Sequence, residues 1–324
     1  MTVRIAVLDD YQSVARRYGD WARLPVETEV TVFTDTVTDH DELVRRLEPF
    51  DVVAAMRERT PFPRRLLEAL PNLRLLVTTG ERNKAIDLDA ATDCGVVVSG
   101  TGNGEVPGRP WGPTAELAWG LILAVTRNIP AEDRNVREGA WQRTVGIELA
   151  RRTLGVIGLG RLGGQVAGVG LAFGMNVIAW SENLTDERAA EAGVRRVDKD
   201  ELLRSADVVT IHQLLSKRTR GLIGAGELDL MKPTAYLVNT SRGPIVDEAA
   251  LQAVLREGRI AGAGIDVYGE EPLPADDPWR TTPRTVLTPH IGYVTEGTYE
   301  AFFADTVEDI AAFLDGQPVR VLNA

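Results

Sequence analysis

The run Gly158-Leu-Gly-Arg-Leu-Gly163 is the part of this sequence with the clearest chemical meaning. It follows an apolar run at residues 153–157 and leads into a helical pattern. Glycines at this spacing let the backbone turn sharply and approach a pyrophosphate, which the free N–H groups at a helix start then bind. A second apolar run, at residues 176–180, ends about 20 residues further on, where such motifs place a ribose-binding side chain. The pattern predicts dinucleotide binding; the alternative is a glycine turn with a structural role.

Three other polar residues each follow an apolar run typical of a buried strand: Arg242, Glu271 and His290. A guanidinium offers a planar pair of donors to a carboxylate, and histidine is the side chain suited to proton transfer near neutral pH. Each residue alone has an ordinary structural explanation. Ligands of open α/β sheets bind where strands end, however, so we expect these residues to share one site with the glycine motif.

The chain resembles the D-isomer-specific 2-hydroxyacid dehydrogenases over nearly its whole length. The resemblance rests on four motifs in the order that the family has them: 158–163, 238–247, 264–272 and 287–292. It implies that Arg242, Glu271 and His290 form the catalytic set. His290 would donate a proton to a keto oxygen during reduction, Glu271 would orient it, and Arg242 would bind the substrate carboxylate. The implied activity is reversible NAD(P)-dependent reduction of a small 2-keto acid, such as glyoxylate, hydroxypyruvate or a phosphoglycerate-type substrate, to the D-2-hydroxy acid.

The resemblance also implies further site residues. Those expected at the cofactor are Gly158, Gly160, Arg161, Leu162, Gly163, Ser181, Glu182, His212, Thr240 and Asp266. Those expected at the substrate, in the loop after the fourth strand, are Thr79, Gly80, Arg82 and Asn83.

Two positions depart from the family pattern. The substrate loop reads Gly80-Glu-Arg82 where the family has two glycines around a small residue, so Arg82 is either a salt-bridged surface residue or an extra anion contact. Ser181 stands where the family often has an aspartate that binds both ribose hydroxyls. The absence of this aspartate would admit NADP. Glu182, however, would repel a 2′-phosphate unless the positive charge of Arg188 compensates for that repulsion. We expect NAD, with NADP as the alternative.

Apolar runs alternate with helical patterns in both halves of the 324-residue chain, which predicts an α/β protein with two doubly wound parallel sheets. The strands are expected at 4–8, 29–33, 52–55, 75–78, 96–98, 153–157, 176–180, 208–211, 236–239, 261–266 and 286–288. By resemblance, a Rossmann dinucleotide-binding domain at 102–293 is inserted into a flavodoxin-like substrate domain at 1–101 and 294–324. The glycine- and proline-rich stretch 99–113 is the expected linker, acting as a hinge, a lid or a dimer arm.

Composition narrows the classes of function. The net charge of −11 argues against a nucleic-acid partner, since phosphate binding needs a basic surface. The single cysteine excludes an intrachain disulfide, and the three histidines show no metal-ligand spacing. Residues 1–8 read as a strand and not as a signal peptide, and the apolar helix at 116–125 is too short to cross a membrane, so a cytoplasmic enzyme is expected.

Thr114 is the expected cap of that helix, whose excess apolar surface, by resemblance, predicts a homodimer contact. The absence of an extension after Ala324 favours a stand-alone reductase. Two alternatives stay open: a formate dehydrogenase-like enzyme, which would typically have an amide in place of Glu271, and a non-catalytic NADH-sensing interaction protein.

Overall fold

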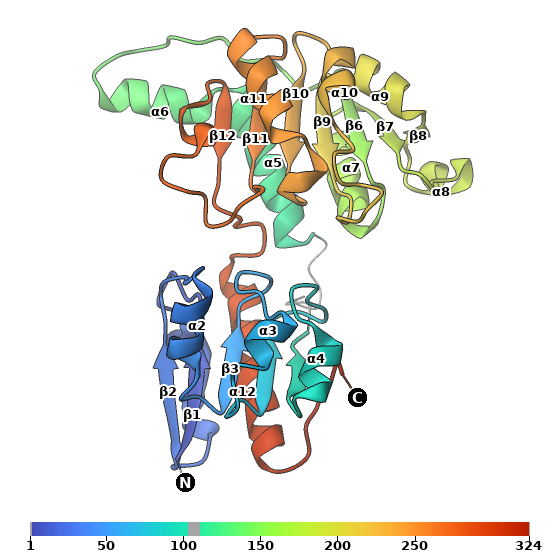
Figure 1. Cartoon of the computed structure of the whole chain (residues 1–324). Coiled ribbons are helices and arrows are strands. Elements are labelled where there is room, and N and C mark those ends of the chain that lie inside the picture. Colours follow the sequence, from blue (N-terminus) through green and yellow to red (C-terminus); the bar gives the residue numbers. More distant parts are fainter. Residues whose placement is uncertain (1, 103–110, 324) are drawn as a thin grey trace. The chain divides into compact units, whose positions relative to one another are not determined.

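The computed structural model describes residues 2–102 and 111–323. The chain divides into two compact units, Met1–Arg109 with Val294–Ala324, and Pro110–Tyr293 (Figure 1). Most of the expected linker at 99–113 lies outside the described residues. Both units are parallel α/β sheets with helices, which confirms the predicted fold class.

The first unit is a five-stranded parallel sheet in the order β2-β1-β3-β4-β5. Its elements are β1 (Val3–Val7), α1 (Ala15–Tyr18), the 3₁₀ helix η1 (Trp21–Arg23), β2 (Thr28–Val32), α2 (His40–Leu47), β3 (Val52–Ala55), α3 (Arg64–Leu67), β4 (Leu75–Thr78), α4 (Leu88–Asp93), β5 (Val97–Gly100) and α12 (Glu296–Leu314).

Helices cover both faces of this sheet. Helices α2, α3 and α4 bury leucines such as Leu47 and Leu66 against one face, and α12 buries Val307 and Ile310 against the other. The C-terminal residues then return to β5, where Leu322 N–H donates to the carbonyl of Val98 at 2.8 Å. The last segment of the chain is therefore part of the first unit.

The second unit is a seven-stranded parallel sheet in the order β12-β11-β10-β9-β6-β7-β8. Its elements are α5 (Pro113–Thr126), α6 (Ile129–Arg137), β6 (Thr153–Ile157), α7 (Arg161–Ala172), β7 (Asn176–Trp180), α8 (Asp186–Glu191), β8 (Arg195–Arg196), α9 (Lys199–Ser205), β9 (Val208–Ile211), α10 (Ala225–Leu230), β10 (Tyr236–Asn239), the 3₁₀ helix η2 (Gly243–Ile245), α11 (Glu248–Glu257), β11 (Gly262–Ile265), the 3₁₀ helix η3 (Pro278–Thr281) and β12 (Thr285–Leu287).

Two apolar cores lie on opposite faces of this sheet. One packs α5 and α7 against the strands, and the other packs α9, α10 and α11 (Figure 1). Because all the strands are parallel, the loops that follow β6, β9, β10, β11 and β12 meet at one edge of the sheet. The polar motifs found in the sequence lie in those loops.

The expected cap of the apolar helix needs correction, whereas its predicted homodimer contact stays a prediction. Its N-cap is Gly112 and not Thr114, whose hydroxyl donates to the carbonyl of Gly292 at 2.9 Å. Most of the apolar residues of α5 are buried within its own unit. Exposed apolar side chains come instead from α6 and the segment after it, including Ile129, Val136, Trp141 and Val145.

Candidate active site

The glycine turn after β6 has the close backbone approaches that the motif predicts. Gly158 has a φ of +100°, which only glycine adopts without strain, and a Cβ atom there would lie 2.4 Å from the carbonyl oxygen of His212. A Cβ atom on Gly163 would lie 1.9 Å from the carbonyl oxygen of Gly158. At Gly160, in contrast, a Cβ atom would meet nothing within 4 Å. The turn is packed tightly on the protein side and open at its middle glycine.

Helix α7 begins directly after this turn, and its N-cap Gly160 offers no side-chain cap. The first turn of a helix leaves backbone N–H groups without intrahelical partners, and the helix dipole favours negative charge at this end of α7. The hydroxyl of Thr240, in the loop after β10, is buried with no hydrogen-bond partner among the described residues. The glycine turn after β6 and the unsatisfied hydroxyl after β10 lie at the same edge of the sheet, with only β9 between their strands, and together they fit a dinucleotide.

The loops on either side of the turn carry other predicted cofactor residues. Trp180, the last residue of β7, accepts the Gly158 N–H at 2.8 Å, so Ser181 follows directly beside the turn and Glu182 is exposed. His212 follows β9, and its Nε2 lies 2.9 Å from the Thr210 hydroxyl. Burial lowers the pKa of His212 to about 4, which keeps this ring neutral near pH 7.

His290 and Glu271 form the central acid–base pair of the second unit. His290 Nδ1 lies 2.5 Å from Glu271 Oε2, and both side chains are only partly exposed. A carboxylate can only accept, so Nδ1 carries the proton and Nε2 is left for a ligand. The other oxygen of Glu271 accepts the Tyr268 N–H at 2.8 Å, which fixes the carboxylate on both sides.

Asp266 holds the loop that carries His290. Its side chain is fully buried and accepts from the Thr288 hydroxyl at 2.6 Å and from the N–H groups of Ile291 and Gly292 at 2.9 and 3.0 Å. Its backbone carbonyl accepts the His290 N–H at 2.8 Å. His290 has a φ of +53°, a strained conformation for a residue with a side chain, and these bonds maintain it. Burial raises the pKa of Asp266.

Arg242 lies in the turn after β10, next to β11 in the sheet. Its Nη1 donates to the carbonyl of Ser241 at 2.8 Å, and the Asn239 amide donates to the carbonyl of Arg242 at 3.0 Å. The structure thus brings Arg242, Glu271 and His290 to the loops of three adjacent strands, β10, β11 and β12. Glu248, which contacts the Glu271 loop, has no signal in the sequence that points to a site, whereas Tyr268 lies within the motif at 264–272.

The predicted substrate loop belongs to the first unit. Gly80 has a φ of +94° and its N–H donates to the Thr101 hydroxyl at 2.7 Å, while the Thr79 hydroxyl accepts the Arg57 N–H at 2.9 Å. Asn83 is buried, and its amide bonds the carbonyl of Arg57 and the hydroxyl of Thr78. Asn83 therefore holds the loop together, and Arg82 is exposed, as are Glu81 and Lys84.

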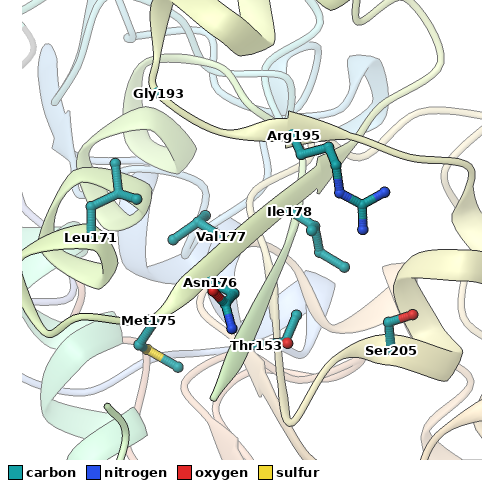
Figure 2. Close-up of a pocket in the computed structure, with 9 residues that line it drawn as sticks. All are labelled: Thr153, Leu171, Met175, Asn176, Val177, Ile178, Gly193, Arg195 and Ser205. Carbon is teal, nitrogen blue, oxygen red and sulfur yellow. The ribbon is translucent and has the colours of Figure 1, made fainter. Parts of the chain in front are cut away.

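A separate hollow of about 510 Å³ opens elsewhere on the second unit (Figure 2). Thr153 and Asn176, the first residues of β6 and β7, line it together with Arg195. It lies at the amino ends of the strands, opposite the glycine turn, where this class of sheet does not bind ligands. Among residues 2–102 and 111–323, no group of three His, Cys, Asp or Glu side chains is arranged to hold a metal ion.

No helix in the described part of the chain has the length and apolar character needed to cross a membrane.

Comparison with known proteins agrees with this geometry. Residues 119–292 match the family model described as D-isomer specific 2-hydroxyacid dehydrogenase, NAD binding domain. The chain is 40% identical over 268 residues to a glyoxylate reductase of Aeropyrum pernix, covering 80% of this chain and 78% of that protein. A solved structure of phosphoglycerate oxidoreductase from Vibrio cholerae o395 superposes with a TM-score of 0.90 at 36% identity, over 97% of this chain and 99% of that one. The chain belongs to the D-isomer specific 2-hydroxyacid dehydrogenase family.

Some relatives are longer proteins. A D-3-phosphoglycerate dehydrogenase of Archaeoglobus fulgidus is 40% identical over 287 residues, which is 88% of this chain and 53% of that protein. The chain thus spans about half the length of this relative. The family's NAD-binding region coincides with the unit that contains the glycine turn.

Proposed function

We propose that this protein reduces a small 2-keto acid to the D-2-hydroxy acid, reversibly and with NADH as the reductant. The observation that carries the proposal is the bond between His290 Nδ1 and Glu271 Oε2, next to the strand that carries Arg242. An oriented acid–base pair beside a guanidinium suits a substrate with a carboxylate and an adjacent carbonyl.

The cofactor would be held by the glycine turn, the start of α7, Ser181 and the Thr240 hydroxyl. When bound, its nicotinamide supplies or accepts the hydride. The loops that carry Arg242, Glu271 and His290 would hold the substrate next to that ring.

The side chains of the second unit would do the proton chemistry. In reduction, protonated His290 donates from Nε2 to the keto oxygen as negative charge develops there, while its Nδ1–H stays bonded to Glu271. Glu271 stabilises the imidazolium before transfer and prevents the ring from rotating. In oxidation, neutral His290 takes the hydroxyl proton back. Arg242 binds the carboxylate of the substrate and draws electron density from its carbonyl.

We further propose that the loop at 79–83 of the first unit binds substrate. Exposed Arg82 is the residue we propose for a second anionic group, such as the phosphate of a phosphoglycerate-type substrate. Arg82→Ala should then raise KM for 3-phosphohydroxypyruvate and leave KM for glyoxylate unchanged. Equal KM values for the wild type and the variant with both substrates would remove Arg82 from the site.

A panel of keto acids tests the function. NADH consumption is measured with glyoxylate, hydroxypyruvate and 3-phosphohydroxypyruvate, and NAD reduction with formate. His290→Gln should lower kcat by about 10²- to 10⁴-fold while NADH binding, followed by fluorescence, is retained. Arg242→Ala should mainly raise KM for the keto acid. If NADH binds but no acid is turned over, the NADH-sensing alternative replaces this proposal; turnover of formate alone would favour the formate dehydrogenase-like alternative.

We also propose that the protein is a homodimer. The four exposed apolar side chains Ile129, Val136, Trp141 and Val145 support this, because exposed apolar residues clustered along one segment commonly mark an interface. Light scattering at low micromolar concentration should give twice the 35.3 kDa chain mass, and a single species of that chain mass would contradict the proposal.

A further inference from the structure

The loop that carries Glu271 lies between β11 and η3 and contains no regular helix or strand. The position of its carboxylate therefore depends on contacts made by the loop backbone. One such contact comes from Glu248, the first residue of α11. Glu248 Oε1 accepts the Gly269 N–H at 2.9 Å and the indole N–H of Trp279 at 3.2 Å.

Helix α11 does not need the Glu248 carboxylate for its own capping. Asp247 is its N-cap and accepts the Ala250 N–H at 3.1 Å. Within the described residues, no lysine or arginine forms an ion pair with Glu248. Within the same residues, its side chain accepts two hydrogen bonds, from Gly269 and Trp279.

The surroundings of Glu248 make these two bonds important. Burial raises its pKa, and the carboxylates of Asp277 and Glu271 raise it further. A partly buried carboxylate near two other acids is costly unless N–H donors compensate it. The Gly269 and Trp279 donors lower its pKa, so they stabilise the ionised form that bridges α11 and the loop.

The path from Glu248 to the acid–base pair is short. Gly269 adjoins Tyr268, whose N–H donates to Glu271 Oε1 at 2.8 Å. Glu271 Oε2 in turn bonds His290 Nδ1. The indole of Trp279 also packs edge-on against the Tyr268 ring, with 6.4 Å between the ring centroids. Each contact fixes the peptide that places Glu271.

We propose that Glu248 is a positioning residue for the His290–Glu271 pair. Glu248 ties the loop that carries Glu271 to the start of α11. Because α11 follows the Arg242 turn in the chain, this contact fixes the position of Glu271 relative to Arg242. The proposal rests on the proposed function only in assigning a catalytic consequence; the positioning itself is a structural statement. Loss of the Glu248 contacts should therefore change kcat and the His290–Glu271 bond, and should leave cofactor binding unchanged.

Four variants test this. Glu248→Ala removes both contacts and should lower kcat about 10- to 100-fold, since small displacements of a catalytic group are costly, while the Kd for NADH stays within about twofold. Glu248→Gln keeps an oxygen that accepts from Gly269 and should retain most of the activity. Glu257→Ala is the matched control, because Glu257 ends the same helix, is exposed and pairs with Arg259. Glu248→Asp, which is too short to reach Gly269, takes the place of Glu248→Ala if that variant does not fold.

A double-variant comparison separates positioning from general destabilisation. If Glu248 acts through Glu271, Glu248→Ala should cost almost nothing further in a Glu271→Gln background. Additive losses in the double variant would overturn the proposal.

A spectroscopic signature tests it without turnover. The chain has three histidines, so the Nδ1–H of His290 is an assignable low-field proton resonance. It should be lost in Glu271→Gln, lost or broadened in Glu248→Ala, and kept in Glu248→Gln and Glu257→Ala. An unchanged resonance and unchanged kcat in Glu248→Ala would overturn the proposal. A resonance that responds in a protein with no keto-acid turnover would instead refute the proposed function and leave the positioning role standing.

Discussion

Gly243 and Tyr268 touch backbone to backbone: a Cβ atom on Gly243 would lie 2.2 Å from the carbonyl carbon of Tyr268 and 2.4 Å from its oxygen. Gly243 directly follows Arg242, and Tyr268 lies in the loop that carries Glu271. The contact therefore sets the separation of two of the three proposed catalytic residues. Since both partners are backbone, neither can move aside for a methyl group.

Gly243→Ala should consequently lower kcat/KM at least tenfold and destabilise the protein by about 1–3 kcal/mol, the usual cost of overpacking. Steady-state kinetics and thermal unfolding measure the two effects. Gly226→Ala is the matched control, because a Cβ atom there meets nothing within 4 Å and alanine favours the helix α10. The packing explanation fails if both variants behave alike.

A second prediction concerns His212. Burial lowers its pKa to about 4, below the value near 6.5 of an unfolded chain, so the unfolded state binds the proton more strongly between these values. This residue should therefore stabilise the fold fully above pH 6.5 and lose that contribution as the pH falls towards 4. In a histidine NMR titration its ring signal should stay at the neutral position from pH 8 to pH 5.

The assignment of that signal comes from its loss in His212→Asn. A midpoint near pH 6.5 for the His212 signal would mean that the ring is solvated and that the burial argument is wrong.

Most of the fold follows from local sequence patterns. The runs at 52–55, 75–78, 153–157, 176–180, 208–211 and 236–239 coincide with β3, β4, β6, β7, β9 and β10. These strands are buried and read as continuous apolar segments. Strand β8 was not predicted because it consists of Arg195 and Arg196, two exposed residues at the sheet edge that carry no apolar signal.

The site is less accessible from the sequence. Motif positions are visible because glycine turns and strand ends are local features. The contacts that orient the side chains are not local. Asp266 accepts from Gly292, which lies 26 residues further along the chain, and Glu248 accepts from Gly269, which lies 21 residues further along. An Asp-Glu pair at a helix start predicts capping, and Asp247 is indeed the N-cap of α11. The pattern gives no sign of the positioning role that we propose for Glu248. Only the order of the strands brings these groups together.

A third prediction concerns Asp309 on α12. Its side chain is fully buried, one oxygen bonds Arg320 Nε at 2.9 Å, and the other has no hydrogen-bond partner among the described residues. Burial raises its pKa to about 7, with Asp305 and Glu308 adding to the rise and Arg320 opposing it. The folded state thus binds this proton more strongly than the unfolded state, whose value is near 3.8.

The contribution of Asp309 to stability is consequently largest at low pH and is lost as the pH rises through about 4 to 7. The unfolding temperature of Asp309→Asn, compared with the wild type, should therefore improve between pH 5 and pH 8. Asp315→Asn, which changes an exposed carboxyl just after the same helix, should show no such trend. A pH-independent difference for Asp309→Asn would show that Asp309 does not titrate between pH 5 and pH 8 in the folded protein.

The fourth prediction concerns the choice of coenzyme. Ser181 follows β7 directly beside the glycine turn, where its hydroxyl can bond a ribose but does not repel a 2′-phosphate. The next residue in the sequence, Glu182, is acidic and exposed. We expect kcat/KM to favour NADH over NADPH because no arginine follows Ser181 directly. Ser181→Asp should increase that preference by about tenfold, almost entirely through KM for NADPH, since like charges 4 Å apart repel by roughly 1 kcal/mol even in water. Glu182→Gln should shift the preference in the opposite direction. A wild-type enzyme that prefers NADPH tenfold would show that the positive charge of Arg188 or of the α7 start outweighs Glu182.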